Sequence, residues 1–254
     1  MIRSFAIISL SIIFFVSTET HSISYNLVLN EPNIEITPST EKIGHTWTNG
    51  TVWDKPLIQK FYSLLKQAKN DIVVFDIGAQ TGCFSLLAKY FPHSTWYAFE
   101  PIQEAVTALQ DNLKLNNIDN VAVLQTAVSD FSGIITLKMP AMNAWGLATI
   151  GATPLRFDTV SEREVPCTHL DSFVRDNNIK KVDFIKIDTE GAELYILHGA
   201  KEMILRDHPI ILMEYNTTNM QQCNVTKEEI HHFLIEMGYT WEQVSSDDIL
   251  CIPR

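Results

Sequence analysis

The sequence predicts an α/β fold in which a doubly wound, mainly parallel sheet carries helices on both faces. From Asp71 onward, short β-branched or aromatic segments alternate with segments whose apolar residues recur at helical spacing. Strands that alternate with amphipathic helices are typical of parallel sheets, because each helix carries the chain back to the same edge. Hydrophobic residues make up 46% of the 254 residues, which excludes global disorder. The net charge of -11 repels phosphate backbones, so no nucleic acid is expected as a partner.

Strands and helices are expected in regular alternation along the chain. The expected strands of the central sheet are Ile72–Ile77, Thr95–Phe99, Val121–Val128, Val182–Ile187 and Pro209–Tyr215. The expected helices surround Phe84–Phe91, Ile102–Leu113, Leu194–Leu205 and Ile230–Met237. The chain ends with Tyr239–Val244 and Ile249–Ile252, which are joined by four polar residues and leave no room for a helix. We therefore expect these two segments to pair antiparallel at one edge of the sheet.

The segment between the third and fourth strands is less regular. Ile134–Met139 has the composition of a strand, whereas Pro140–Arg163 is interpreted as an inserted loop. Loops of this length inside a compact domain are usually functional lids or disordered.

Residues 1–22 are interpreted as a separate unit. Arg3 precedes a run from Phe5 to Val16 that is apolar apart from two serines, shorter than the ~20 residues of a membrane-spanning helix. A basic start, a short apolar centre and polar residues after it are typical of a secretory signal peptide. An uncleaved signal anchor is the alternative, which would attach the chain to a membrane through residues 5–16. Either interpretation places the remainder in the secretory pathway, as a luminal, secreted or membrane-anchored protein.

Residues 23–70 are interpreted as a leader, and residues 71–254 as the main domain. The leader lacks strong periodicity up to Thr51 and then carries a helix that Asp54 is expected to cap. The four cysteines form no CxxC pair, so metal binding through them is not expected. A disulfide between Cys223 and Cys251 is one interpretation, and four buried thiols are the other.

A glycine-containing turn follows the first strand of the sheet. The sequence VVFDIGAQTGCFS places Asp76 at the strand end and Gly78 and Gly82 in the turn before the next helix. Glycines there let a ligand approach the backbone, and the free N–H groups of a helix start favour its anionic part. The spacing is DxGxxxG rather than the GxGxxG of dinucleotide sites. The acid would repel a pyrophosphate but suits a ligand that is cationic or presents an amine.

A second acid, Glu100, ends the next strand and is expected beside the glycine turn. A carboxylate at this position can accept two hydrogen bonds from the 2′- and 3′-hydroxyls of a ribose. An NAD site would also use such an acid, so Glu100 alone indicates an adenosine-type ligand.

These residues resemble a known family. DIGAQTG followed by FEP resembles the cofactor-binding half of class I S-adenosylmethionine-dependent methyltransferases, and FIKIDTEGAELYILHGA at Phe184–Ala200 resembles the hallmark of FkbM-type methyltransferases. The segments Ala127–Asp130 and Ile211–Asn216 resemble that family too. The resemblance extends from about Asn70 to Arg254. It implies a seven-stranded Rossmann-like sheet, S-adenosyl-L-methionine as cofactor, and O-methylation of a hydroxyl on a glycan or another small molecule.

The motifs and the resemblance together give a set of expected cofactor-binding residues. They are Asp76, Gly78, Ala79, Thr81, Gly82, Glu100, Pro101, Ala127 and Asp188.

Acidic side chains after two later strands are the candidates for catalysis. Asp188 follows the strand Val182–Ile187, and in a parallel sheet it would share an edge with the earlier acids. Asp188 and Glu190 are candidates to orient the acceptor, to accept its proton or to help hold the methionine ammonium, and Glu214 ends a further strand. Asn216 completes an oxygen-rich set of the kind that some O-methyltransferases use for Mg²⁺. Three oxygens from two strands are too few to predict a metal, and none is expected.

Two alternatives stand beside an S-adenosylmethionine-dependent O-methyltransferase. One is an NAD-dependent oxidoreductase of similar fold, against which the missing GxGxxG and the antiparallel tail count. The other is a catalytically inactive secreted binding protein on the same scaffold, against which the intact acids and glycines count. The sequence predicts neither the acceptor nor the oligomeric state.

Overall fold

The computed structural model describes residues 22–38, 40, 47–48, 51–52, 54–68, 71–140, 144–152 and 159–254. The predicted signal peptide or anchor at residues 1–22 lies outside the described residues, apart from Ser22. Within the described ranges, no helix combines the length and the apolar content that crossing a membrane requires.

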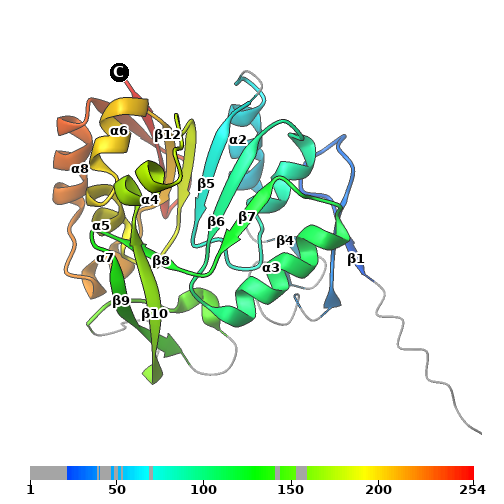
Figure 1. Ribbon diagram of the computed structural model, residues 1–254, viewed down its shortest axis with the longest axis horizontal. Helices are drawn as coiled ribbons and strands as arrows, with labels where there is room; N and C mark the ends of the chain where they lie inside the picture. The colour runs from blue at the N-terminus through cyan, green and yellow to red at the C-terminus, as the bar shows by residue number, and fades with distance from the viewer. Residues whose placement is uncertain are drawn as a thin grey trace, which may run out of the picture.

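The central sheet contains seven strands in the described part of the chain, in the order β13-β14-β12-β11-β5-β6-β7 (Figure 1). These are β5 (Val73–Ile77), β6 (Thr95–Phe99), β7 (Val121–Leu124), β11 (Phe184–Ile187), β12 (Ile210–Glu214), β13 (Tyr239–Gln243) and β14 (Asp248–Pro253). Strands β12, β11, β5, β6 and β7 are parallel, whereas β14 runs antiparallel to both of its neighbours. The predicted α/β class, with a mostly parallel sheet and an antiparallel pair at one edge, is confirmed.

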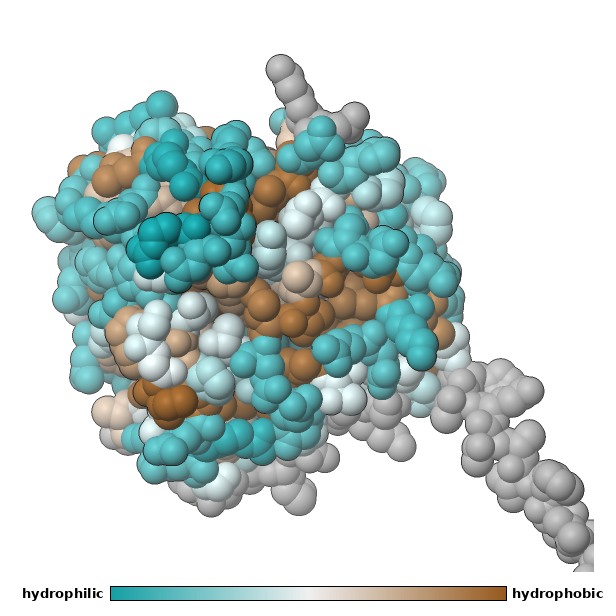
Figure 2. Space-filling model, viewed as in Figure 1, coloured by the Kyte–Doolittle hydropathy of each residue, from teal (hydrophilic) through white to brown (hydrophobic). Residues whose placement is uncertain are grey.

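Helices cover both faces of this sheet (Figure 1). They are α2 (Lys55–Leu65), the 3₁₀ helix η1 (Ser85–Tyr90), α3 (Gln103–Leu115), α4 (Leu170–Asp176), α5 (Glu193–His198), α6 (Lys201–Asp207), α7 (Thr217–Gln222) and α8 (Lys227–Glu236). Alternate strand residues point to opposite faces. Trp96 therefore packs against Phe61 of α2, whereas Phe75 packs against Phe173 of α4. On the face shown in Figure 2, most of the surface is hydrophilic and an apolar band crosses its middle.

The leader contributes to the core on one face of the sheet. Strand β1 (Ile23–Tyr25) pairs antiparallel with β2 (Ile34–Ile36), and their apolar side chains join the cluster beneath α2. Asn116, just after α3, holds β2 by accepting a hydrogen bond from the N–H of Glu35 and donating one to its carbonyl oxygen. A second short pair consists of β3 (Trp47–Thr48) and β4 (Thr51–Val52).

The predicted cap of α2 is wrong. Asp54 has a left-handed backbone with φ 53°, and its side chain makes no capping hydrogen bond. The helix instead begins with a proline in its first turn, where the missing N–H costs no hydrogen bond.

A small second sheet corrects two predictions. It has the order β8-β10-β9, with β8 (Ala127–Ser129), β9 (Gly133–Pro140) and β10 (Thr159–His169). Val121–Val128 was expected to be one strand, but the chain leaves the central sheet after Leu124 through a tight turn, in which the N–H of Thr126 donates to the Leu124 oxygen. Part of the predicted loop Pro140–Arg163 is strand, because β10 begins at Thr159 and pairs with β9.

Two of the expected helices differ from the prediction. The helix expected around Phe84–Phe91 is the 3₁₀ helix η1. The helix expected at Leu194–Leu205 is divided into α5 and α6 near Gly199, where a Cβ would lie 2.2 Å from the Ser129 oxygen of the second sheet.

All four cysteines lie in described ranges, and each is a buried free thiol. The disulfide interpretation is therefore wrong, and the interpretation as four buried thiols is confirmed.

Candidate active site

A cavity of about 600 Å³ lies at the C-terminal ends of β5, β6, β11 and β12. The chain passes from β5 to β6 on one side and later returns to β11 on the other, so the strand order reverses here. Open α/β sheets bind their ligands in the crevice at such a reversal. The cavity is therefore the candidate active site.

The glycine turn after β5 is locked against two other strands. The N–H groups of Gly78 and Ala79 both donate to the carbonyl oxygen of Phe99, at 3.0 and 3.1 Å. Gly78 has φ +75°, and a Cβ built on it would lie 1.8 Å from the backbone oxygen of Asp188. Only glycine fits at this contact, which leaves bare backbone at the cavity wall.

Glu100 follows β6 and lines the cavity beside this turn. Its Oε2 accepts a hydrogen bond from the N–H of Gln80 and its Oε1 accepts one from the N–H of Ile102, both at 2.9 Å. Burial raises the pKa of Glu100 to about 7, although the two N–H groups favour the ionised form. Since each carboxylate oxygen has a second lone pair, an ionised Glu100 can still accept both hydroxyls of a diol.

Asp76 is buried behind the glycine turn and lies close to a lysine. Its Oδ2 accepts a hydrogen bond from Ser85 at 2.6 Å, and its Oδ1 lies 3.9 Å from the Nζ of Lys186. The same ammonium lies 3.2 Å from Asp188 and donates to the carbonyl oxygen of Gly78. Burial alone would lower the pKa of Lys186, but the carboxylates of Asp188 and Asp76 raise it. Among the described residues that line the cavity, Lys186 is the only basic one.

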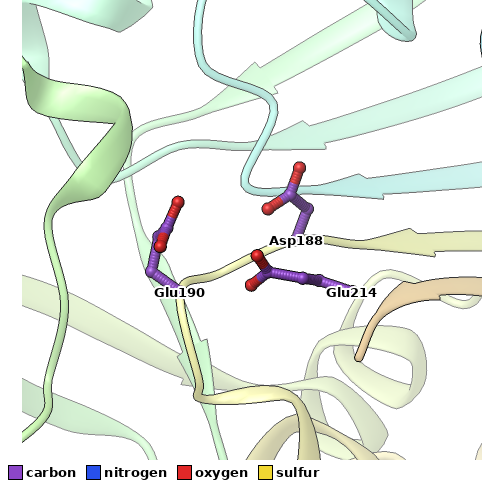
Figure 3. Close-up of side chains that lie close together, drawn as sticks. All are labelled: Asp188, Glu190 and Glu214. Atoms are coloured by element: carbon purple, nitrogen blue, oxygen red, sulfur yellow. The ribbon is translucent and has the colours of Figure 1, made fainter. Parts of the chain in front are cut away.

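Three carboxylates, those of Asp188, Glu190 and Glu214, lie together at one side of the cavity (Figure 3). Asp188 follows β11, Glu190 lies in the turn after it, and Glu214 ends β12. The amide nitrogen of Asn219 donates to Oε2 of Glu190 at 2.6 Å and to Oε1 of Glu214 at 2.8 Å. Burial and then the charge of Asp188 raise the pKa of Glu214 well above its usual range. The cluster can orient a polar acceptor and accept a proton from it.

The opposite wall is apolar and comes largely from outside the central sheet. Leu137 of β9 and the short 3₁₀ helix η2 (Trp145–Leu147) contribute to it, together with Phe99 and Ile102. The helix η2 packs tightly on the glycine turn, since a Cβ on Gly146 would lie 2.0 Å from the Nε2 of Gln80.

The structure brings most of the predicted site residues together. Those that line the cavity are Gly78, Ala79, Glu100, Pro101, Ala127, Asp188, Glu190 and Glu214. Asp76, Thr81 and Gly82 are not part of its lining and lie behind its wall. The Thr81 carbonyl accepts a hydrogen bond from Asn112, and a Cβ on Gly82 would meet Leu109 at 2.3 Å. These three residues therefore shape the turn. They were expected to contact the cofactor directly, but they do not face the cavity.

Sequence reasoning missed several lining residues. A lysine within the buried segment FIKI was a signal for Lys186, because an unpaired charge is costly in a buried strand. The length of the predicted loop Pro140–Arg163 indicated a functional lid or a disordered segment, and η2 lies within it. No local signal pointed to Asp54 or to the turn at Ser245–Asp248, which also line the cavity. They come from segments whose position depends on tertiary packing.

Comparison with known proteins gives the family. The family model described as Methyltransferase FkbM domain matches residues 76–240, more than half of the chain. This span begins at Asp76 and contains the glycine turn, Glu100 and the three-carboxylate cluster.

Curated relatives match part of the chain. Methyltransferase 1 of Beauveria bassiana is 28% identical over 148 residues, which cover 51% of this chain and 59% of the relative. Methyltransferase sdnD of Sordaria araneosa is 28% identical over 171 residues, covering 56% and 64%. The 2-O-methyltransferase NoeI of Sinorhizobium fredii is 24% identical over 178 residues, covering 65% and 70%. The chain spans less than two thirds of the length of the first two relatives. By the match over residues 76–240, the chain belongs to the methyltransferase FkbM domain family.

Proposed function

We propose that the protein transfers a methyl group from S-adenosyl-L-methionine to a hydroxyl oxygen of a glycan or another small molecule. The observation that carries the proposal is the adjacency of Gly78 and Glu100, bare backbone beside a buried carboxylate, at the strand-order reversal. Family membership supports methyl transfer as the reaction type.

The residues around the cavity suit the parts of this cofactor. Glu100 would accept the two ribose hydroxyls, and the apolar side chains of Phe99 and Ile102 suit a nucleobase. The methionine part carries an ammonium and a carboxylate. Asp188 and Lys186, which lie 3.2 Å apart on the cavity wall, offer one charge of each sign to these groups.

When bound, the cofactor supplies an activated methyl group on a sulfonium sulfur. The protein then has to orient the acceptor, exclude water and accept the hydroxyl proton. We assign the proton-accepting role to the cluster of Asp188, Glu190 and Glu214. Because its pKa is raised, Glu214 in its ionised form is a stronger base than an ordinary carboxylate.

A neutral hydroxyl acceptor fits the charges around the cavity. Asp54, Asp247 and Asp248 line it in addition to the cluster, so an anionic acceptor would be repelled. The name of the relative NoeI, a 2-O-methyltransferase, supports transfer to oxygen.

Neither alternative is favoured. An NAD-dependent oxidoreductase would place a pyrophosphate at the glycine turn, but the 3₁₀ helix η1 that follows has six residues and the wall carries several carboxylates. A binding protein without catalysis would have no need of a clustered set of acids beside an adenosine-type site.

Transfer of a radiolabelled methyl group from S-adenosyl-L-methionine to a panel of glycans and small alcohols tests the proposal. We expect label in an ether that is stable to mild base, and at least a hundredfold slower transfer by Asp188→Asn. Labelling of nitrogen or sulfur in place of oxygen would contradict the O-methyl assignment. Cofactor binding without transfer to any member of the panel would favour the binding-protein alternative.

A further inference from the structure

Glu190 has a strained backbone in the turn that follows β11. Its φ of 57° is left-handed, a conformation that residues other than glycine rarely adopt. The next residue, Gly191, has φ 108°, and a Cβ on it would lie 2.1 Å from the carbonyl oxygen of Asn219. A strained backbone of this kind persists only where the surrounding contacts hold it in place. The contacts made by the Glu190 backbone are therefore of interest.

The buried hydroxyl of Thr149 is one of these contacts. Its Oγ1 donates to the carbonyl oxygen of Glu190 at 2.8 Å, and the Nε2 of Gln222 donates to the same oxygen at 3.0 Å. Thr149 is 0% exposed, and its Oγ1 accepts a hydrogen bond from the N–H of Gly151 at 3.0 Å. A hydroxyl has one proton to donate, and here that proton is directed at the Glu190 backbone.

The second sheet in turn fixes the position of Thr149. The N–H of Thr149 donates to the carbonyl oxygen of Lys138 in β9 at 3.2 Å, and its own carbonyl oxygen accepts from the Lys138 N–H at 2.8 Å. Further along, the N–H of Ala152 donates to the carbonyl oxygen of Gln222 at 2.9 Å. Thr149 therefore connects β9 with the turn that carries Glu190.

The backbone of Glu190 determines where its carboxylate lies. The amide of Asn219 donates to Oε2 of Glu190 at 2.6 Å and to Oε1 of Glu214 at 2.8 Å, which holds the two carboxylates side by side (Figure 3). Burial is the largest cause of the raised pKa of Glu214, and the charge of Glu190 is among the others. If the turn relaxed to a right-handed backbone, the Glu190 carboxylate would move away from Glu214.

We propose that Thr149 is a positioning residue, whose hydroxyl maintains the left-handed turn at Glu190 and thereby places the Glu190 carboxylate for methyl transfer. The proposal rests on the proposed function, in which Glu190 and its neighbours orient the acceptor and accept its proton. Thr149 does not line the cavity, so it acts through Glu190 and not on the acceptor. Misplacement of a reacting group by about 1 Å can slow a reaction about 100-fold. The second sheet thus contributes to catalysis through Thr149.

Three variants separate this role from a loss of stability. Thr149→Val removes the hydroxyl and keeps the shape of the side chain, whereas Thr149→Ser keeps the hydroxyl. Ser94→Ala is the matched control, because the buried Ser94 hydroxyl also donates to a backbone oxygen, that of Phe91, and accepts a hydrogen bond from Trp96. Ser94 precedes β6 and so lies at the edge of the sheet opposite the cavity.

Methyl-transfer kinetics, with an acceptor from the panel that wild type methylates, provide the first test. We expect the kcat of Thr149→Val to be lower by about tenfold or more, while its affinity for S-adenosylhomocysteine changes by less than about threefold. Thr149→Ser should recover most of the lost kcat. Ser94→Ala should have a lower Tm but a kcat close to that of wild type. Equal losses of kcat in Thr149→Val and Ser94→Ala would overturn the proposal.

Nuclear magnetic resonance of isotope-labelled glutamate side chains provides a test that needs no acceptor. The carboxyl signal of Glu214 is identified by its absence in Glu214→Gln. It should titrate at lower pH in Thr149→Val and in Glu190→Gln than in wild type, because the charge of Glu190 no longer lies beside it. Thr149→Ser and Ser94→Ala should leave this titration unchanged. A Glu214 titration in Thr149→Val that matches wild type would overturn the proposal.

The two tests distinguish a failure of this proposal from a failure of the proposed function. If the Glu214 titration changes as predicted but no acceptor is methylated, the proposed function fails, whereas Thr149 still places the Glu190 carboxylate. If an acceptor is methylated and Thr149→Val behaves as Ser94→Ala does in both tests, only the role of Thr149 fails.

Discussion

The Nζ of Lys186 lies 3.9 Å from the carboxylate of Asp76, and both side chains are buried beneath the face that carries α2 and η1. The pair arises from strand register, since Lys186 of β11 is directly opposite Asp76 of β5. Removing one partner of a buried ion pair leaves the other charge uncompensated. The pair therefore connects the stability of the sheet with the position of the glycine turn.

Lys186→Met should destabilise the fold by about 3–5 kcal/mol at pH 8, because Asp76 then remains buried without its counter-charge. Urea unfolding, followed by tryptophan fluorescence, measures the change. The double variant Asp76→Asn/Lys186→Met is the control, and it should recover a large part of the loss. Equal destabilisation in the single and the double variant would show that the lysine acts through packing.

The same variant should show a characteristic pH dependence. Burial already raises the pKa of Asp76 and Lys186 opposes this rise, so losing the lysine raises that pKa further. A carboxyl group whose folded pKa is raised binds its proton in the folded state, which favours folding as the pH falls. The deficit of Lys186→Met relative to wild type should therefore shrink between about pH 8 and about pH 5. A deficit that is constant with pH would contradict this account.

Gly78→Ala should disrupt the cavity, whereas Gly238→Ala should not. The two glycines have similar φ values of +75° and +79°, but a Cβ on Gly78 would lie 1.8 Å from the Asp188 oxygen, while a Cβ on Gly238 meets nothing within 4 Å. We expect a cost of about 1–2 kcal/mol for Gly238→Ala from backbone strain alone. Gly78→Ala should cost several-fold more or abolish binding of S-adenosylhomocysteine. Similar losses in the two variants would contradict the close contact.

The affinity for S-adenosylhomocysteine should depend on the ionisation of Glu100. Its pKa is about 7, and the ribose hydroxyls bind the ionised form best, so below pH 7 a proton has to leave before binding. The affinity should fall by up to about tenfold per pH unit below 7 and should level off above it. Glu100→Gln is the control, because it removes the titration of Glu100 but keeps the titrations of the ligand and of the other residues. Its pH profile of affinity is the reference for that of wild type. Parallel pH profiles for wild type and Glu100→Gln would show that Glu100 is not in contact with the diol.

All four thiols should be protected in the folded protein. Each cysteine is buried and free, so a thiol reagent should react slowly with the native chain and with four thiols after denaturation without a reductant. Detection of two thiols after denaturation would show that a disulfide is present.

The glycine turn and Glu100 were predictable because they depend on local sequence and on one rule of parallel sheets. Strands that run parallel end at the same edge, which brings Gly78, Glu100 and Asp188 together without further information. The contact between Lys186 and Asp76 was not predicted, because it depends on the register between β11 and β5.

Two other features had no sufficient signal in the sequence. The segment Val121–Val128 looks like one strand, since its composition does not show that the chain turns after Leu124 to pair with β10. The position of η2 over Gln80 is set by the packing of β9 and β10, which are far from the glycine turn in sequence. Tertiary packing overrides local propensity at both places.

Calorimetric titration of the full chain with S-adenosyl-L-methionine, S-adenosylhomocysteine and NAD tests the central claim most directly. We predict one binding site for each of the first two ligands, no heat with NAD, and loss of the binding heat in Glu100→Ala while the protein stays folded. Binding of NAD alone, or unchanged affinity in Glu100→Ala, would contradict the assignment of this cavity to a methyl donor.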